Sequence, residues 1–244
     1  MNNLYFKIVE ILINLVDKKN KDYIFNFLKK KTLEKKIIAF DVGAHKGETL
    51  NIFLNNFNVE KIYCFEPNTK VFNILEKEKK FKSDTVSLFN FGLGETEEYK
   101  QLNIFSDTSS STFNIIDKKS KYFLRKKKIL NPFSDDFFLD KMFSKIETMS
   151  NFISNNSISK IDILKIDTEG YEYYVLKGIN KIDFDKIDYI YFEHHYDLMI
   201  KKNYKFRDID NLLTKNNFEK KFKSKMKFRK SFEYIYKNKN FNFD

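Results

Sequence analysis

Residues 37–49 read IIAFDVGAHKGET, and this stretch decides the fold of the chain. Four uncharged residues precede Asp41, and two glycines, Gly43 and Gly47, follow it before a helical pattern begins. This order is typical of a buried parallel strand that ends in a tight turn and opens a helix, the junction where α/β sheets bind nucleotides. Neither glycine has a Cβ, so Gly43 permits a sharp turn and Gly47 permits close approach of a ligand or a helix. Asp41 could accept hydrogen bonds from a ligand above the turn, although a strand–turn–helix without a ligand has the same pattern.

The second strand, Lys61–Phe65, ends in Glu66, Pro67 and Asn68. Glu66 lies about 25 residues beyond the first acidic turn, where Rossmann-like folds hold the two hydroxyls of a ribose. Pro67 stops the strand, and Asn68 can cap the helix predicted over Val71–Lys79.

Polar residues also follow the later buried strands. The remaining strands are predicted at Val86–Phe91, Ile161–Ile166 and Ile187–Phe192, with an antiparallel hairpin at Phe218–Phe222 and Phe232–Tyr236. Asp167, Thr168 and Glu169 follow one of these strands, and Glu193, His194 and His195 follow the next. Because the carboxyl ends of parallel strands share one edge of a sheet, we expect these side chains to converge on one cleft.

One segment interrupts the alternation of strands and helices. Ser106–Thr112 is a polar loop, and Asp117–Phe143 combines a Lys-rich run with an acidic and aromatic run. The segment 117–143 is predicted either to be a solvated helical insertion or to form a lid over an acceptor site. We favour the lid.

Length and composition favour one globular domain over residues 1–244, because 42% of the residues are hydrophobic and 17% are aromatic. The net charge is +11, yet only three of the 45 basic residues are Arg. Nucleic-acid surfaces rely on Arg for bidentate contacts, so we expect no nucleic-acid partner. The charge suits an anionic small molecule, such as a nucleotide-linked sugar.

The N-terminal residues 1–36 have the apolar spacing of amphipathic helices. We expect these helices to pack on the sheet or on a second copy of the chain in a homo-oligomer; a helix at a membrane surface is the alternative. No run approaches the length of a membrane span, and no signal peptide is recognised. The single cysteine, Cys64, lies in an apolar run and is predicted to be a packed thiol. We expect a soluble, cytoplasmic protein.

Five segments together resemble the FkbM-type S-adenosylmethionine-dependent methyltransferases: FDVGAHKGE, CFEPN, NFGLGE, IETMSNFI and LKIDTEGYEYYVLKGI. The resemblance covers residues 37–195, and the segment containing DTEG is its most characteristic part. It implies a Rossmann-like class I methyltransferase fold of the α/β class. In that fold a mainly parallel seven-stranded sheet is closed by an antiparallel C-terminal hairpin.

The resemblance also implies how S-adenosylmethionine binds. Asp41, Gly43 and Gly47 would surround its methionine and ribose, Glu66 would hold the ribose hydroxyls, and Asn68 could contact the adenosine. His45 stands where this family often has asparagine, which makes a direct backbone contact at that position doubtful. The predicted cofactor-binding residues are Asp41, Gly43, His45, Gly47, Thr49, Glu66, Pro67, Asn68, Gly92 and Asp167.

Methyl transfer from a sulfonium is an in-line displacement, and a hydroxyl acceptor needs a base or a metal ion nearby. The predicted catalytic residues are Asp167, Glu193, His194 and His195, with a neutral histidine as the favoured base. The alternative is a divalent cation bound by Asp167, Glu193 and His194. Ser111, Glu169 and His195 are predicted to bind the substrate, although Glu169 also suits a helix start.

Family members typically methylate hydroxyl groups, so the resemblance implies an O-methyltransferase acting on a sugar, sugar nucleotide or glycan precursor. A second hypothesis is an NAD(P)-dependent sugar-nucleotide oxidoreductase, because Tyr173 and Lys177 form a Tyr-x-x-x-Lys pair. Tyr122 and Lys126 form the same pair, which shows how often it arises in this chain. A third is a nucleic-acid methyltransferase, which the charge allows but no motif favours.

Overall fold

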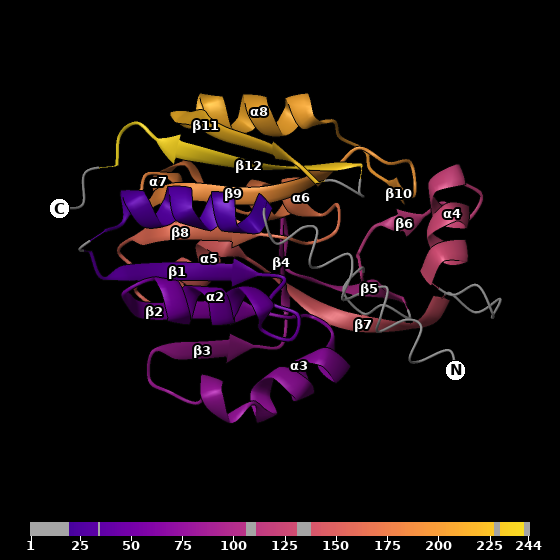
Figure 1. Ribbon diagram of the computed structural model, residues 1–244, viewed down its shortest axis with the longest axis horizontal. Helices are drawn as coiled ribbons and strands as arrows, with labels where there is room; N and C mark the ends of the chain where they lie inside the picture. The colour runs from indigo at the N-terminus through magenta and orange to yellow at the C-terminus, as the bar shows by residue number, and fades with distance from the viewer. Residues whose placement is uncertain (1–19, 34, 106–110, 131–137, 227–229, 242–244) are drawn as a thin grey trace.

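A seven-stranded sheet forms the centre of the molecule in the computed structural model, which describes residues 20–33, 35–105, 111–130, 138–226 and 230–241 (Figure 1). The strand order is β11-β12-β9-β8-β1-β2-β3. The strands are β1 (Ile37–Val42), β2 (Val59–Phe65), β3 (Val86–Phe89), β8 (Ile161–Ile166), β9 (Ile187–His195), β11 (Phe218–Lys225) and β12 (Ser231–Asn238). The first five are parallel, and β11 and β12 add an antiparallel hairpin at one edge. The predicted fold class and hairpin are confirmed.

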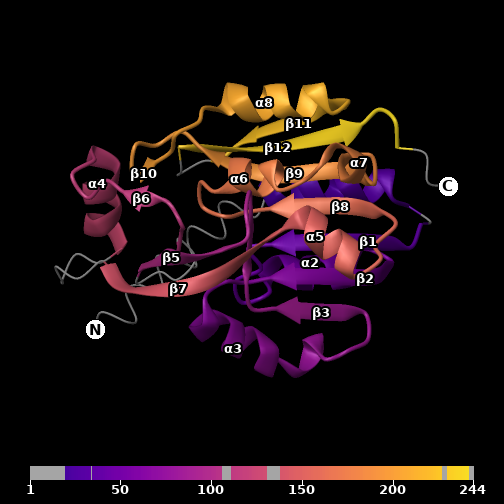
Figure 2. The same cartoon turned by 180° about the vertical axis from the view of Figure 1, so that it is seen from behind.

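Helices cover both faces of this sheet, which explains why its central strands are so apolar. Residues 20–31, α2 (Glu48–Asn56) and α3 (Thr69–Lys77) lie on one face (Figure 1). On the other face lie α5 (Met149–Asn155), α6 (Glu172–Lys177), α7 (Lys181–Phe184) and α8 (Phe206–Lys215), as Figure 2 shows from behind. The rest of the predicted N-terminal helices, residues 1–19, falls outside the described residues.

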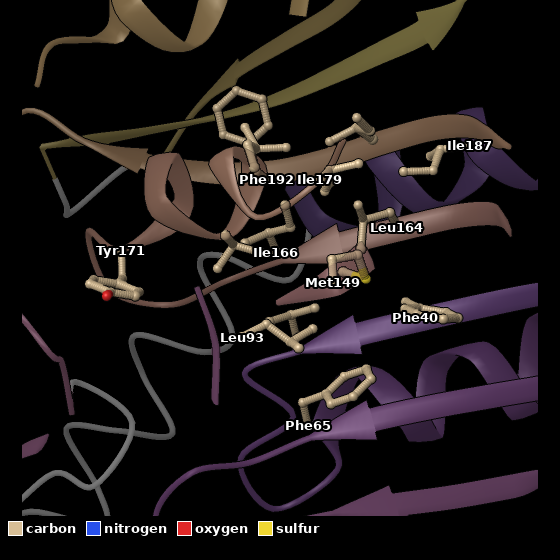
Figure 3. Close-up of a cluster of buried hydrophobic side chains, with 14 of the residues drawn as sticks. Phe40, Phe65, Leu93, Met149, Leu164, Ile166, Tyr171, Ile179, Ile187 and Phe192 are labelled. Atoms are coloured by element: carbon tan, nitrogen blue, oxygen red, sulfur yellow. The ribbon is translucent and has the colours of Figure 1, made fainter. Parts of the chain in front are cut away.

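Two apolar cores separate the layers. The larger contains Phe40, Phe65, Leu164 and Phe192 and lies on the face of α5, α6 and α8 (Figure 3). The Phe152 ring of α5 packs edge-on against Phe65, with ring centroids 4.8 Å apart. The smaller core lies under residues 20–31 and α2, and Cys64 is buried in it as a free thiol, as predicted.

A second sheet lies beyond the carboxyl ends of the parallel strands (Figures 1 and 2). Its order is β4 (Gly92–Gly94), β7 (Phe138–Thr148) and β5 (Glu98–Phe105). Next to it are a short pair, β6 (Ile115–Ile116) with β10 (Ile200–Lys201), and the helix α4 (Lys121–Leu130). A single 3₁₀ turn, Lys79–Phe81, follows α3.

The predicted segment 117–143 differs from the structure at its C-terminal end. Residues 138–143 form the first half of β7, which pairs antiparallel with β5. The backbone groups of β5 need a partner, and β7 supplies it. The helical part of the segment is α4 alone, and residues 131–137 lie outside the described part of the chain. None of the helices in the described ranges has the length and apolar content needed to cross a bilayer.

Candidate active site

A cleft of about 550 Å³, open to solvent, lies at the carboxyl ends of β1, β2 and β8. Its polar lining consists of His45, Glu66, Ser111, Thr112, Asp167, Thr168, Glu169 and Tyr171. The remaining lining residues are Val42, Gly43, Phe65, Pro67, Gly92, Leu93, Leu102 and Phe113.

Two backbone amides hold the Glu66 carboxylate at the end of β2. The N–H of His45 donates to Oε2 and the N–H of Asn68 donates to Oε1, both at 2.8 Å. Burial raises the pKa of Glu66, and these hydrogen bonds oppose the rise. Since a carboxylate offers about four acceptor sites, each oxygen can still accept a bond from a ligand. The backbone amide of residue 45 therefore serves the protein's own carboxylate.

Asn68 caps α3, as predicted. Its Oδ1 accepts hydrogen bonds from the N–H groups of Lys70 and Val71, at 3.1 and 3.4 Å. Its Nδ2 is buried and has no hydrogen-bond partner among the described residues. A buried donor of this kind costs stability unless a water or ligand satisfies it.

The turn after β1 lies against the end of β8. Gly43 has a φ of 82°, and a Cβ there would lie 2.0 Å from the carbonyl oxygen of Asp167. Only glycine fits this approach and this backbone conformation without strain. The N–H groups of Gly43 and Ala44 both donate to the Phe65 carbonyl at 3.0 Å, which ties the turn to β2.

Beneath the turn, a buried ion pair joins β1 to β8. Lys165 Nζ lies 2.8 Å from Asp41 Oδ1, donates to the Gly43 carbonyl at 3.1 Å, and lies 3.8 Å from Asp167 Oδ2. Although burial opposes a charged ammonium, the carboxylates of Asp41 and Asp167 raise the pKa of Lys165. Burial raises the pKa of Asp41, and Lys165 offsets part of that rise. Asp41 is fully buried and does not line the cleft, so any effect of Asp41 on a ligand acts through Lys165 and this turn.

The turn after β8 carries two cleft carboxylates. Asp167 has a side chain that is 35% exposed, whereas Glu169 is buried. Glu169 and Gly170 both have positive φ, 49° and 90°. A positive φ at a residue with a side chain is uncommon and marks a conformation that its surroundings impose.

Long-range hydrogen bonds hold this turn in place. Thr112 Oγ1 donates to the Glu169 carbonyl at 2.8 Å. Asn114 Nδ2 and Tyr204 OH both donate to the Gly170 carbonyl, at 2.6 and 2.8 Å. Gly170 N–H donates to Glu172 Oε1 at 2.7 Å. The turn that carries Glu169 is therefore held by Thr112 and Asn114 from one segment and by Tyr204 from another.

A family model described as the methyltransferase FkbM domain matches residues 41–220 of the chain. The chain belongs to the FkbM methyltransferase family. No curated protein sequence matches it.

Two solved structures show the same fold. TrmK of M. capricolum, in complex with S-adenosyl-homocysteine, is 13% identical with a TM-score of 0.51, over 90% of this chain and 69% of that chain. Magnesium protoporphyrin IX methyltransferase (ChlM) from Synechocystis PCC 6803, with bound SAH, is 9% identical with a TM-score of 0.51, over 93% of this chain and 85% of that chain. At these identities the likeness concerns the fold alone, and it confirms the class I methyltransferase architecture.

In this FkbM methyltransferase, His195 lies behind Glu169 among three carboxylates. Its Nε2 is 3.5 Å from Glu169 Oε2 and 3.7 Å from Glu193 Oε1, and its Nδ1 is 3.5 Å from Asp197 Oδ2. Burial alone would lower the pKa of His195, but these carboxylates raise it to about 10. His195 is therefore a cation at neutral pH, and it does not line the cleft.

His194 points to the opposite face of β9, since neighbouring side chains of a strand alternate. Its ring lies 4.8 Å from Tyr196, 5.9 Å from Tyr204 and 5.7 Å from Phe206. Burial lowers the pKa of His194 to about 3. His194 is neutral but lies in an aromatic cluster outside the cleft lining, so neither histidine has the arrangement expected of the predicted neutral base.

The predicted metal site is not supported for the same reason. Glu193 and His194 are adjacent on β9 and face opposite sides of the sheet, so they cannot share an ion with Asp167. Across the residues that the structure describes, no group of three His, Cys, Asp or Glu side chains could hold a metal ion.

The sequence-predicted site residues divide into two sets. Those that line the cleft are Gly43, His45, Glu66, Pro67, Gly92, Ser111, Asp167 and Glu169. Those that do not are Asp41, Gly47, Thr49, Asn68, Glu193, His194 and His195. Gly47 serves packing, because a Cβ there would lie 2.5 Å from the Phe81 ring.

The sequence reasoning missed Lys165, Thr112, Phe113 and Tyr171. Lys165 had a signal, since it is the one basic residue in the buried strand IDILKI. Tyr171 follows the DTEG turn directly, and this position in the sequence was its signal. Thr112 and Phe113 had no local signal, because only tertiary contacts bring them to the cleft.

Proposed function

We propose that this FkbM methyltransferase transfers a methyl group from S-adenosylmethionine to a hydroxyl group of a sugar, sugar nucleotide or glycan precursor. One observation carries the proposal. A single cleft is lined by Glu66, whose carboxylate two backbone amides hold, and by Asp167 and Glu169 at the end of β8. The first carboxylate suits a ribose diol, and the other two suit the hydroxyls of an acceptor.

The cleft residues fit the cofactor. Glu66 retains acceptor sites for two ribose hydroxyls. Asn68 lies next to the cleft lining, and its buried Nδ2 has no hydrogen-bond partner among the described residues, so it could donate to an acceptor such as an adenine nitrogen. A Cβ at Gly92 would lie 2.8 Å from the Phe113 ring, so the wall of the cleft is close-packed there. The bound S-adenosyl-homocysteine in TrmK and ChlM, together with the family, supports the same cofactor here.

When bound, S-adenosylmethionine would supply a methyl group on a sulfonium, a new C–O bond would replace the C–S bond, and a neutral thioether would remain. The hydroxyl proton of the acceptor would have to leave. Asp167 takes this proton, because its side chain lines the cleft and is partly exposed, so the proton can pass on to water. Glu169 accepts a hydrogen bond from a neighbouring hydroxyl of the acceptor and fixes its orientation.

Two cations behind the cleft act as positioning residues. His195 Nε2 lies 3.5 Å from Glu169 Oε2, and Lys165 Nζ lies 3.8 Å from Asp167 Oδ2 beneath the Gly43 turn. Each cation attracts a carboxylate oxygen and so holds a cleft side chain in place, with acceptor sites left for the hydroxyl groups of a substrate.

The oxidoreductase alternative has less support. Lys177 pairs with Glu95 and lies 5.8 Å from the centroid of the Tyr173 ring, and neither Tyr173 nor Lys177 lines the cleft. Calorimetry with S-adenosylmethionine, S-adenosyl-homocysteine and NAD separates the two readings. We expect binding of the first two ligands, and binding of NAD alone would overturn the proposal.

The acceptor can then be found by mass spectrometry. Sugar nucleotides, free sugars and glycan precursors are incubated with the enzyme and S-adenosylmethionine that carries a labelled methyl group. Resistance of the labelled product to mild alkaline hydrolysis excludes a methyl ester, as O-methylation of a hydroxyl requires. If RNA is labelled in a parallel reaction and no sugar is labelled, the acceptor is a nucleic acid and the proposed acceptor class is wrong.

A further inference from the structure

A basic lobe, residues 111–130 and 196–203, lies at the end of the molecule beyond the carboxyl ends of the strands (Figures 1 and 2). It contains β6, α4 and β10. A small core packs α4 against the short strands, and it consists of Phe123, Met199 and Ile200 of the lobe together with Phe105 at the end of β5. The lobe is therefore a folded unit that presents one side of α4 outward.

The outward side of α4 combines basic and aliphatic side chains. Its exposed residues are Lys121, Leu124, Arg125, Lys128 and Ile129. Their spacing of three and four residues makes them one continuous stripe on the helix. Leu124 is 53% exposed and Ile129 is 41% exposed, so the two aliphatic side chains share this exposed stripe with the three cations.

The charge of this surface is concentrated. Residues 117–128 contain seven basic side chains and one acidic side chain, Asp117. Within the described ranges, Lys121, Arg125 and Lys128 form no ion pair. Close by in the lobe, Leu198 is 80% exposed, and Ile115 lies exposed opposite Lys201. Exposed leucine and isoleucine side chains amid unpaired cations need a specific explanation.

We propose that the basic lobe docks on the surface of an anionic phospholipid membrane. The Lys and Arg side chains would meet the headgroup phosphates, and Leu124, Ile129 and Leu198 would enter the boundary of the acyl chains. A nucleic acid fits this surface less well, because aliphatic side chains beside the cations have no partner on a phosphate backbone. Base stacking uses exposed aromatic residues, and the described exposed residues of α4 include none; Tyr196, at the edge of the lobe, is 45% exposed.

Docking at this lobe would hold the cleft near the headgroup layer. Thr112 and Asn114 at the base of the lobe bond to the turn that carries Glu169, and a Cβ at Gly170 would lie 2.8 Å from Ile200 of β10. A lipid-anchored acceptor would then present its hydroxyl beside that turn. This consequence rests on the proposed function, whereas membrane docking itself does not.

Vesicle sedimentation tests the docking. The full chain is mixed with vesicles of phosphatidylcholine alone and of phosphatidylcholine with phosphatidylglycerol. We expect binding only to the anionic vesicles, and we expect it to weaken as salt is added. The triple variant Lys121→Gln, Arg125→Gln, Lys128→Gln should bind about a hundredfold more weakly, since each cation near the surface contributes about fivefold.

A matched control carries the same change of charge elsewhere. Lys29, Lys30 and Lys31 are exposed at the end of the helix of residues 20–31, and their triple Gln variant should keep wild-type binding. Equal losses in the two triple variants would reduce the effect to net charge and overturn the proposal. Failure of the wild-type chain to bind anionic vesicles would also overturn it.

A tryptophan reporter tests the insertion of the aliphatic residues, since the chain contains no Trp. Leu124→Trp should show a blue-shifted emission with anionic vesicles. Ile182→Trp, at an exposed position on α7 outside the lobe, should show no shift. An unshifted Leu124→Trp spectrum, or binding of RNA but not of vesicles by the wild-type chain, would contradict the membrane as the partner.

Discussion

Lys165 Nζ lies 2.8 Å from Asp41 Oδ1, and the two side chains are only 4% and 0% exposed. They occupy paired positions on the neighbouring strands β8 and β1, directly beneath the turn that lines the cleft. A buried pair of this kind contributes little compared with an apolar pair, but removing one partner leaves a charge buried without compensation. The pair therefore makes the cleft turn sensitive to changes at either strand.

The first prediction concerns this pair. Lys165→Met should lower the free energy of unfolding by about 3–5 kcal/mol, because it leaves the Asp41 carboxylate uncompensated. The double variant Asp41→Asn, Lys165→Met should recover a large part of the loss. Urea unfolding followed by circular dichroism measures both. The exposed pair Lys221–Glu219 supplies the control, and Lys221→Met should cost at most about 1 kcal/mol. A loss in the double variant equal to that in Lys165→Met would contradict the role assigned to the pair.

The second prediction concerns cofactor binding. Glu66→Ala should weaken binding of S-adenosyl-homocysteine by about 1–3 kcal/mol, because it removes a carboxylate that accepts hydrogen bonds from the ribose. Isothermal titration calorimetry measures the change. Glu76→Ala, at an exposed position on α3, is the control and should bind as the wild type does. Unchanged affinity in Glu66→Ala, in a variant that still folds, would show that Glu66 does not hold the ribose.

The third prediction concerns proton transfer. Asp167→Asn keeps the size of the side chain but removes its basicity, so turnover should fall by roughly 10²–10⁴-fold. Binding of S-adenosyl-homocysteine should remain within about threefold of the wild type, which a cofactor-binding role would not permit. Asp140→Asn, an exposed carboxylate paired with Lys70, is the matched control and should keep full turnover. Full activity in Asp167→Asn would move the base to another residue, with Glu169→Gln as the next variant to measure.

The fourth prediction concerns pH. The pKa of His195 in the folded state is about 10, above the ordinary value of about 6.5 in the unfolded chain. The stabilisation from its charged form is therefore complete below about pH 6.5 and is lost as the pH rises towards 10. Glu233, with a pKa raised to about 8 by burial and by Glu193, contributes a decrease of the same sign at lower pH. We expect the free energy of unfolding of the wild type to fall between pH 8 and 9.5.

His195→Gln separates the two groups. Its free energy of unfolding should fall less steeply than that of the wild type between pH 8 and 9.5, because Gln does not titrate. Parallel curves for the two proteins would remove His195 from the explanation. If a neutral histidine were the base, turnover would rise with pH as the imidazole loses its proton. We expect His195→Gln to leave the pH dependence of turnover unchanged.

The parallel strands and the sheet edge that carries their polar ends could be predicted from the sequence because they depend on local patterns. Apolar runs ending in polar residues predicted β1, β2, β8 and β9, and the handedness of their connections brings their ends to one edge. The face on which each end residue points was harder to predict. Val42 lines the cleft whereas Asp41, one residue earlier, is buried beneath it. Moving the predicted end of a strand by one residue reverses the face of the sheet on which the end residue points. The hydrophobic pattern does not locate a strand end more closely than one residue.

The charge state of His195 could not be predicted, because it depends on residues from three segments. Glu169 comes from the turn after β8, Glu193 from β9 and Asp197 from the loop that follows. The pairing of residues 138–143 in β7 was missed for a similar reason. Its partner, β5, precedes it by some 40 residues, and no periodicity in the segment indicated so distant a pairing.

The last prediction concerns the lid. Segment 117–143 was predicted to close over the acceptor, and its described helix, α4, connects to the cleft through the base of the basic lobe. Thr112 and Asn114 bond to the backbone of the turn that carries Glu169 and Gly170, so an acceptor that contacts Glu169 should steady the lobe. We expect the amides of α4 to exchange more slowly when both S-adenosyl-homocysteine and the acceptor found by mass spectrometry are bound, but not with the cofactor product alone.

Hydrogen exchange followed by mass spectrometry measures this protection in peptides covering residues 121–130. Peptides from α8, which packs on the far side of the sheet from the N-terminal helix and outside the lobe, are the internal control and should exchange equally in all states. Protection that appears in α4 only with vesicles would assign the segment to docking, and equal exchange in every state would make it a fixed surface element. A lid requires a response to the acceptor itself, because closure has a function only when the reacting hydroxyl is inside.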